Sequence, residues 1–257
     1  MITEKMIVIA AATFKEIWKS KILLNVFFIG LGMMVVTYVA TEFTFGVPER
    51  VAMDFGLGML SLSSIGISLF LGVGLLAREI DSRTVYMVIS RPVPRFVFIL
   101  GKILGLMGIQ IVNVFLLSTM TILATVMLGG QISELLIWAV VFSLLESLML
   151  LLVVVLISLL ANTVLSVLLS VVLLLLGHAV RETQEIAFVT TNAFLMKVLD
   201  FYHFVLPAFY KLNLKSEVIY KSALPAAYLW KSGAYGVFYS TFLLFMIVYL
   251  FNRKNLD

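Results

Sequence analysis

The side chain best suited to chemistry in this 257-residue sequence is Glu146, an isolated carboxyl group in a long apolar run. An acid in such a run is costly to bury, so we expect it to face the interior of a helix bundle and to find a partner there. It has two interpretations, a transport pathway or gate and a structural hydrogen bond between helices. Ser143 and Ser147 lie on a neighbouring face. Gln110 and Asn113 are the polar side chains expected at a similar depth.

Cysteine and the common catalytic sequence motifs are missing from the sequence. It contains no cysteine, so disulfides, thiolate metal sites and cysteine nucleophiles are excluded. It contains no G-x-x-x-x-G-K-[ST], H-E-x-x-H or G-x-S-x-G motif. The two histidines, His178 and His203, are far apart in sequence and are more typical of packing or interface positions than of metal ligands. We predict no catalytic, cofactor or metal residue in this chain.

The composition indicates a membrane protein. Hydrophobic residues make up 62% of the chain and charged residues only 12%, against roughly 25% charged residues in soluble domains. So few charges cannot cover the surface of a soluble fold, whereas a lipid-facing surface can be apolar. We therefore predict an all-α integral membrane protein with one transmembrane domain, residues 1–257.

Six apolar runs are long enough to cross a bilayer, which takes about 20 residues. The run from 135 to 177 would be roughly 64 Å long as one helix, twice the hydrocarbon core, so it must contain two spans. Its polar break is Ala161-Asn162-Thr163. The predicted spans are residues 22–41, 55–77, 96–128, 135–160, 164–180 and 234–251.

Basic residues orient these spans, because Lys and Arg collect on the cytoplasmic side. With the amino terminus inside, 11 of the 18 basic residues fall in inner segments. Six of the others are spread along a long outer segment, which counts least in this rule. We expect both termini to be cytoplasmic. The inner basic residues are Lys5, Lys15, Lys19, Lys21, Arg78, Arg83, Arg91, Arg95, Lys102, Arg253 and Lys254.

Two segments outside the spans have patterns of their own. Residues 4–21 repeat apolar side chains at helical spacing, which predicts an amphipathic helix in the inner interface; a plain extension of the first span is the alternative. Residues 181–231 are rich in aromatic side chains and are broken by Pro207 and Pro225. Aromatic rings favour the membrane surface, so we expect short helices folded onto or into the outer leaflet.

Small residues recur at intervals of four within two of the spans. Ser64, Ser68 and Gly72 do so in the second span, and Gly101 and Gly105 in the third. This spacing predicts close approach between helix backbones.

The loop from 78 to 95 concentrates charge between two apolar runs. We expect a short helix along the inner surface that ends before Pro92, because a residue preceding proline avoids the helical region. Tyr86, Met87 and Val88 would be its apolar knobs, suited to a groove on a soluble partner. The alternative is a solvated turn whose basic side chains anchor lipid headgroups.

At this loop the sequence resembles a known family. Arg78-Glu79-Ile80-Asp81-x-Arg83-Thr84, then Ile89-Ser90-Arg91-Pro92-Val93-Pro94-Arg95 and Gly101-Lys102, are similar to the inner-loop motif of type-two ABC exporter permeases, including the copper-maturation and gliding-type permeases. These are the membrane subunits of transporters whose ATPase is a separate chain. Many members have Gly-Thr where this chain has Arg83-Thr84.

The resemblance implies a fold, a site and partners. It implies six spans, an amino-terminal elbow helix at 4–21, a coupling helix in 78–95 and an acid in the fourth span, where Glu146 falls. The expected partners are a soluble P-loop ATPase that binds the ATP and Mg, a second copy or a homologous permease, membrane lipid and a possible periplasmic protein, with no nucleic acid. The expected location is the bacterial inner membrane. The ATPase-docking residues would be Glu79, Asp81, Arg83, Thr84, Tyr86, Met87 and Arg91.

Two alternatives to export remain open. The same fold can anchor a mechanotransmission or assembly complex in which no substrate crosses the bilayer. An intramembrane enzyme would need paired polar residues within the bilayer, and the sequence offers Glu146 alone.

Overall fold

The computed structural model describes residues 2–43, 48–81, 94–184, 206–220 and 224–253, with only the backbone described at 76–81 and 180–184. All secondary structure within these residues is helical. The elements are α1 (Ile2–Lys19), α2 (Ile22–Glu42), α3 (Pro48–Asp81), α5 (Arg95–Met127), α6 (Glu134–Leu160), α7 (Thr163–Gln184), the 3-10 helix η1 (Phe209–Leu212), α10 (Lys215–Ile219) and α11 (Ala226–Arg253).

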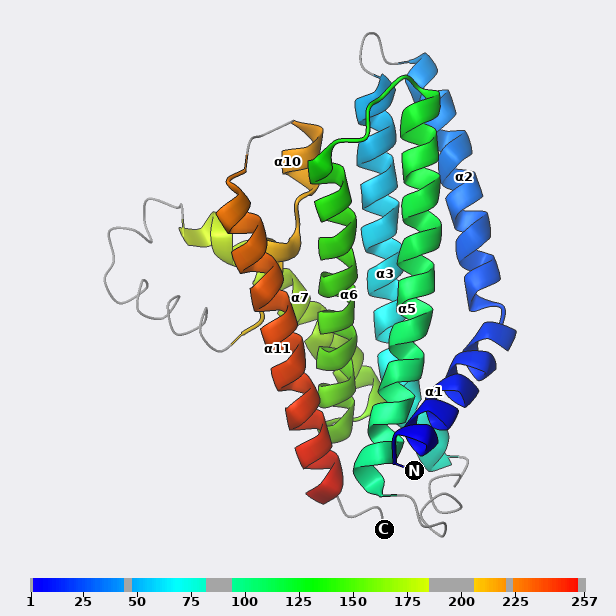
Figure 1. The fold of residues 1–257 in the computed structure, drawn as a ribbon, viewed down its shortest axis with the longest axis vertical. Coiled ribbons are helices and arrows are strands. Elements are labelled where there is room, and N and C mark those ends of the chain that lie inside the picture. The colour runs from blue at the N-terminus through cyan, green and yellow to red at the C-terminus, as the bar shows by residue number, and fades with distance from the viewer. Residues whose placement is uncertain (1, 44–47, 82–93, 185–205, 221–223, 254–257) are drawn as a thin grey trace.

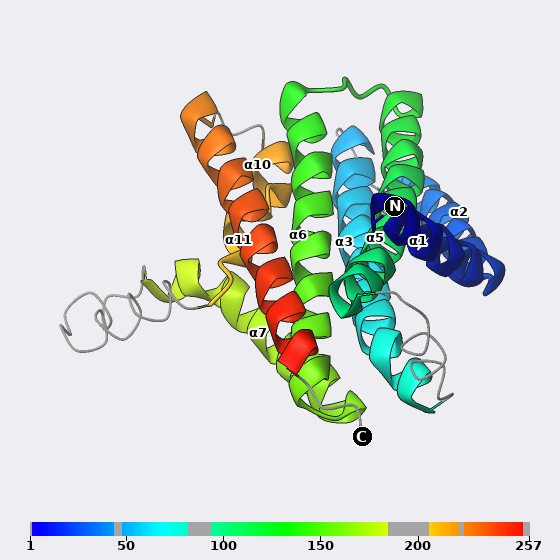
Figure 2. The ribbon, with the colours of Figure 1, turned by 60° about the horizontal axis from the view of Figure 1, so that its bottom comes forward.

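The long helices stand side by side and alternate in direction (Figures 1 and 2). The start of α1, the start of α5 and the end of α11 lie at one end of the bundle, which we call the basal end. The start of α3 and the end of α5 lie at the opposite, distal end. Helix α3 packs between α5 and α6, so it forms the middle of the bundle.

Five helices are long and apolar enough to cross a membrane, namely α2, α3, α5, α6 and α11. Helix α7 carries a shorter apolar stretch, Thr163–Ala179. The chain therefore has the character of a multi-pass membrane protein. The six predicted apolar ranges lie inside the helices to within one residue, although α11 begins at Ala226, earlier than the range 234–251 indicates.

The predicted break between the fourth and fifth apolar ranges is confirmed. Helix α6 ends at Leu160 and α7 begins at Thr163. The Oδ1 atom of Asn162 accepts a hydrogen bond from the backbone N–H of Leu165 at 2.9 Å, so Asn162 caps the start of α7. The polar residue that interrupts the apolar run thus also starts the next helix.

Helix α1 packs against the basal half of α5 through a stripe of glycines. A Cβ atom on Gly101 would lie 2.8 Å from Cβ of Ile9, and one on Gly105 would lie 2.7 Å from the carbonyl oxygen of Ala10. The close approach predicted at these two glycines is confirmed. Their partner is the amino-terminal helix, whose apolar face packs on α5.

Helices α3 and α5 are longer than a bilayer requires. They contain 34 and 33 residues, which is about 50 Å each at 1.5 Å per residue, against a hydrocarbon core of about 30 Å. Both helices therefore extend well beyond an apolar layer of that thickness.

The contact between α1 and α5 is tested by Gly105→Ala. The added methyl group would meet both the Ala10 carbonyl and the Thr13 side chain, so we expect a loss of about 1–3 kcal/mol in the free energy of unfolding. Denaturant titration in mixed micelles measures it. Gly66→Ala is the matched control, because a Cβ there meets nothing within 4 Å. Equal stability of the two variants would show that α1 does not rest on α5 this closely.

Candidate functional site: a buried polar layer beneath a distal pocket

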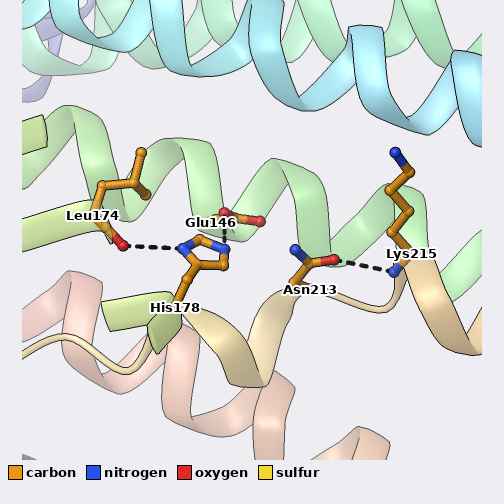
Figure 3. Close-up of polar contacts among 5 residues, drawn as sticks. All are labelled: Glu146, Leu174, His178, Asn213 and Lys215. Atoms are coloured by element: carbon orange, nitrogen blue, oxygen red, sulfur yellow. Dashed lines mark hydrogen bonds and ion pairs between the residues drawn. The ribbon is translucent and has the colours of Figure 1, made fainter. Parts of the chain in front are cut away.

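A close contact between a buried acid and a histidine joins α6 to α7. Glu146 is 7% exposed, and its Oε1 atom lies 3.2 Å from Nε2 of His178. The other ring nitrogen, Nδ1, lies 3.0 Å from the carbonyl oxygen of Leu174 (Figure 3). Glu146 therefore points into the bundle and has a partner, as the sequence predicts for a buried acid.

The α6–α7 turn explains why these two residues meet. Glu146 lies 16 residues before Asn162, and His178 lies 16 residues after it. Two antiparallel helices of equal rise bring residues that are equally far from their turn to the same level. The pair is thus about 24 Å from the turn, near the middle of α6.

A second polar cluster joins α3 to α5 in the interior of the bundle. The hydroxyl of Ser63 donates to Oδ1 of Asn113 at 3.0 Å, and Nδ2 of Asn113 donates to the hydroxyl of Ser64 at 3.1 Å. Nε2 of Gln110 donates to the Ser64 carbonyl oxygen at 3.1 Å. Gln110 and Asn113 are fully buried, so they hold two helices together rather than facing solvent.

Helix α3 connects the two clusters. The hydroxyl of Ser68, one turn beyond Ser64, donates to the backbone carbonyl of Ser147 on α6 at 2.9 Å. Gly72 follows one turn later, and a Cβ atom there would lie 2.7 Å from Val154 of α6. The prediction that these small residues mark close helix contacts is confirmed. We call the set that links α3, α5, α6 and α7 the polar layer. Its members are Ser63, Ser64, Ser68, Gln110, Asn113, Glu146, Ser147 and His178.

Residues 206–220, which we call the distal unit, cover the polar layer on the α7 side. The ring of Phe209 is fully buried and stacks on the imidazole of His178, with centroids 6.0 Å apart and planes 5° from parallel. The backbone N–H of Ala208 donates to the Tyr235 hydroxyl of α11 at 2.8 Å. Gly177 allows the chain to approach, since a Cβ there would lie 2.5 Å from the Pro207 carbonyl oxygen.

An open pocket of about 420 Å³ lies between the distal unit and the bundle. We call it the distal pocket. An ion pair between Lys215 Nζ and Asp54 Oδ1, 2.8 Å apart, crosses its wall. Both side chains are more than a third exposed, so this pair contributes roughly 0–1 kcal/mol. The pocket is lined by Asp54, His178, Tyr210, Asn213, Lys215, Ser216, Ile219 and Tyr220.

Lys211 of η1 contacts Tyr235 of α11. Its ammonium group lies 4.7 Å from the centre of the Tyr235 ring, a cation–π contact. Burial lowers the pKa of Lys211, because a charged ammonium loses hydration there.

The chemistry open to this arrangement is ion pairing and proton binding. Within the described parts of the chain, no group of three or more His, Cys, Asp or Glu side chains is placed to hold a metal ion. Among the described residues, the titratable groups that line the distal pocket are an imidazole, a carboxylate, an ammonium and two phenols.

The proposed docking residues fall at the edge of what the structure describes. Glu79 and Asp81 lie in the last turn of α3, of which only the backbone is described. Arg83, Thr84, Tyr86, Met87 and Arg91 lie outside the described residues.

Comparison with known proteins gives no identification. No model of a protein family matches the chain. No curated protein matches it either.

The sequence predicts that Glu146 has a partner but does not identify it. His178 is that partner, whereas the sequence indicates only a packing or interface position for it. A histidine next to an apolar run has no local pattern that indicates a specific contact. The available signal was its position, equally far from Asn162 as Glu146. The sequence predicts a close helix contact at Ser64 but singles out no role for Ser63, although the hydroxyls of both bind Asn113.

The contact between Glu146 and His178 is tested by replacing Glu146 with Leu and with Gln. Leu removes the acceptor of the partly buried imidazole, which we expect to lower the free energy of unfolding by about 1–3 kcal/mol. Gln keeps an oxygen acceptor, so we expect a smaller loss of unfolding free energy. Chemical unfolding in mixed micelles gives both values. Glu134→Gln, at an exposed position in the same helix, is the control and stays near wild type. A Glu146→Leu variant as stable as wild type contradicts the assigned pairing.

Proposed function

We propose that this chain is the membrane permease subunit of an ATP-driven ABC transporter, which couples ATP hydrolysis by a separate ATPase chain to export or to transmembrane conformational work. The observation that carries the proposal is the charged motif between Arg78 and Lys102, which resembles the ATPase-docking loop of type-two exporter permeases. The chain itself then needs no catalytic residue, because ATP and Mg bind to the partner.

The position of this motif in the fold supports the proposal. It joins the end of α3 to the start of α5, the central helix of the bundle to one of its two main neighbours. The start of α5 is held by α1 at Gly101 and by α11, where Phe98 stacks on Phe251 at 6.3 Å between centroids. A force applied to this segment therefore acts directly on the packed middle of the bundle.

In the proposed complex, each ATPase docks on one permease copy. Glu79, Asp81, Arg83, Thr84 and Arg91 make the polar contacts with the ATPase. Tyr86 and Met87 fill its groove as apolar anchors. Helix α1 acts as the elbow that supports the contact. ATP-driven closure of two ATPases then produces rigid-body rocking of the spans and opens a path between two permease copies.

The proposed topology has six spans in a bacterial inner membrane, with both termini cytoplasmic. Helix α7 is the fifth span in this scheme. Its apolar stretch, Thr163–Ala179, is short, and the distal unit packs against its far end at Gly177.

A second candidate function is favoured by the way the distal unit is attached. It contacts α6, α7 and α11 through buried side chains, including Phe209 and Leu212. Movement of these helices would displace the distal surface without any substrate crossing. The chain would then anchor a mechanotransmission or assembly complex with a periplasmic partner.

Co-purification tests the proposed partner. The tagged chain, taken from its own membranes in mild detergent, is expected to bring down a soluble P-loop ATPase in equal amount together with ATP hydrolysis. Charge reversal at both sites, Glu79→Arg with Arg83→Glu, should reduce the recovered ATPase by about tenfold or more, since breaking a desolvated charged contact costs about 2–5 kcal/mol.

The control for this experiment is Glu134→Arg, a charge reversal at the distal end of α6 that leaves ATPase recovery unchanged. Absence of any ATPase across several mild detergents would refute the permease assignment. The loop would then be a basic membrane anchor, and a stand-alone membrane protein would become the leading interpretation.

A further inference from the structure

The imidazole ring of His178 lies between two hydrogen-bond acceptors. Nδ1 is 3.0 Å from the Leu174 carbonyl oxygen, and Nε2 is 3.2 Å from the Glu146 carboxyl oxygen. A neutral imidazole carries hydrogen on only one nitrogen, so it can satisfy only one of these acceptors if Glu146 is ionised. An imidazolium satisfies both and also neutralises the buried carboxylate.

We propose that Glu146 and His178 form a proton-binding site that is loaded from the distal pocket and, when occupied, latches the distal unit onto α6 and α7. Loading transfers one proton from hydronium in the pocket to the ring nitrogen that lacks hydrogen, and water remains. The product is an imidazolium–carboxylate pair with no net charge. Release reverses the step and leaves a neutral ring with one N–H, so that either the Leu174 carbonyl or the Glu146 carboxylate faces a nitrogen lone pair.

Access to the site is through the ring and not through the acid. The His178 side chain is 31% exposed and lines the distal pocket, whereas the Glu146 side chain is 9% exposed (Figure 3). Water in the pocket therefore reaches the imidazole, and the carboxylate lies behind it.

The other groups around the ring do not compete for this role. Asp54 of α3 and Lys215 of α10 line the same pocket, but they pair with each other at 2.8 Å and their charges cancel. Tyr210 of η1 and Tyr220 also line it, and a tyrosine is ordinarily uncharged near neutral pH. Among the residues that the structure describes, the carboxylate of Glu146 on α6 is the acidic group in contact with the ring.

The ring also positions the distal unit. Phe209 stacks on it, and the adjacent Ala208 holds α11 through its hydrogen bond to Tyr235. If the proton leaves, one of the two ring nitrogens faces its acceptor with a lone pair and that hydrogen bond is lost. The ring is then held on one side only and moves, and Phe209 loses its stacking surface. Proton occupancy thus controls how firmly the distal unit is seated.

Nuclear magnetic resonance tests the proton directly, with the full chain in lipid nanodiscs. The chain has two histidines, so His203→Gln leaves His178 as the single ring to observe with ¹⁵N-labelled histidine. At about pH 7.5, where a free imidazole is mostly neutral, we expect both ring nitrogens of His178 to carry hydrogen. Glu146→Gln should leave hydrogen on one nitrogen, and Glu134→Gln should change nothing. A neutral ring in the His203→Gln protein overturns the proton site.

Cysteine labelling tests the latch. The chain has no native cysteine, so Ala208→Cys places a single thiol at a position only 3% exposed. Its rate of reaction with a water-soluble maleimide, relative to that of Ser216→Cys at an exposed position, reports opening of the distal unit. We expect this ratio to rise about tenfold in Glu146→Gln, to stay unchanged in Glu134→Gln, and to rise with pH when Glu146 and His178 are intact.

A second variant keeps the test decisive if Glu146→Gln fails to assemble by size-exclusion chromatography. His178→Gln retains an N–H donor toward Glu146 but cannot gain a proton, so the labelling ratio should lose its dependence on pH. If neither substitution changes the labelling ratio or its dependence on pH, the proposed latch is overturned. Neither assay requires an ATPase, so failure here is distinct from failure of the proposed permease function.

Discussion

A polar side chain that is shut away from water must find its partner inside the protein, and this constraint organises the middle of the bundle. Burying an unpaired amide, hydroxyl or carboxyl group costs several kcal/mol. Here Asn113 and Gln110 bind hydroxyl and backbone groups of α3, and Glu146 meets His178. Each of these contacts crosses from one helix to another. The polar layer therefore fixes the register of four helices that apolar packing alone would allow to slide.

Small residues make this pairing possible, because short side chains bring helix backbones within reach of one another. Ser64 and Ser68 lie one turn apart on α3 and reach α5 and α6 respectively. Gly101 and Gly105 seat α1 on α5, and Gly177 lets the distal unit close over the end of α7. Small residues thus allow close packing in the interior, at the basal end and at the pocket wall.

Much of the helical architecture could be predicted from the sequence, whereas the pairing of side chains between helices could not. Apolar runs reveal helices because each run is a local property, and Asn162 reveals the α6–α7 turn for the same reason. Helix α11 begins at Ala226, before the predicted span 234–251, because Tyr228, Trp230 and Lys231 are helical without being strongly apolar. The contact of His178 with Glu146 depends on how two helices face each other, which no local pattern encodes. The docking residues from 83 to 91 stay a prediction, since they lie outside the described residues.

Because α3 is long, the polar layer can act as a pivot for the helix. Ser64 is fixed near the middle of the helix, and Asp81 ends it 17 residues later, about 25 Å away. A stiff helix held at its midpoint works as a lever arm with its pivot at the hydrogen bonds of Ser64 and Ser68. A tilt of about 5° around that pivot displaces the basal tip by about 2 Å, while the paired side chains at the pivot hardly move. The basal and distal ends of the bundle can thus exchange motion through α3 without breaking its buried hydrogen bonds.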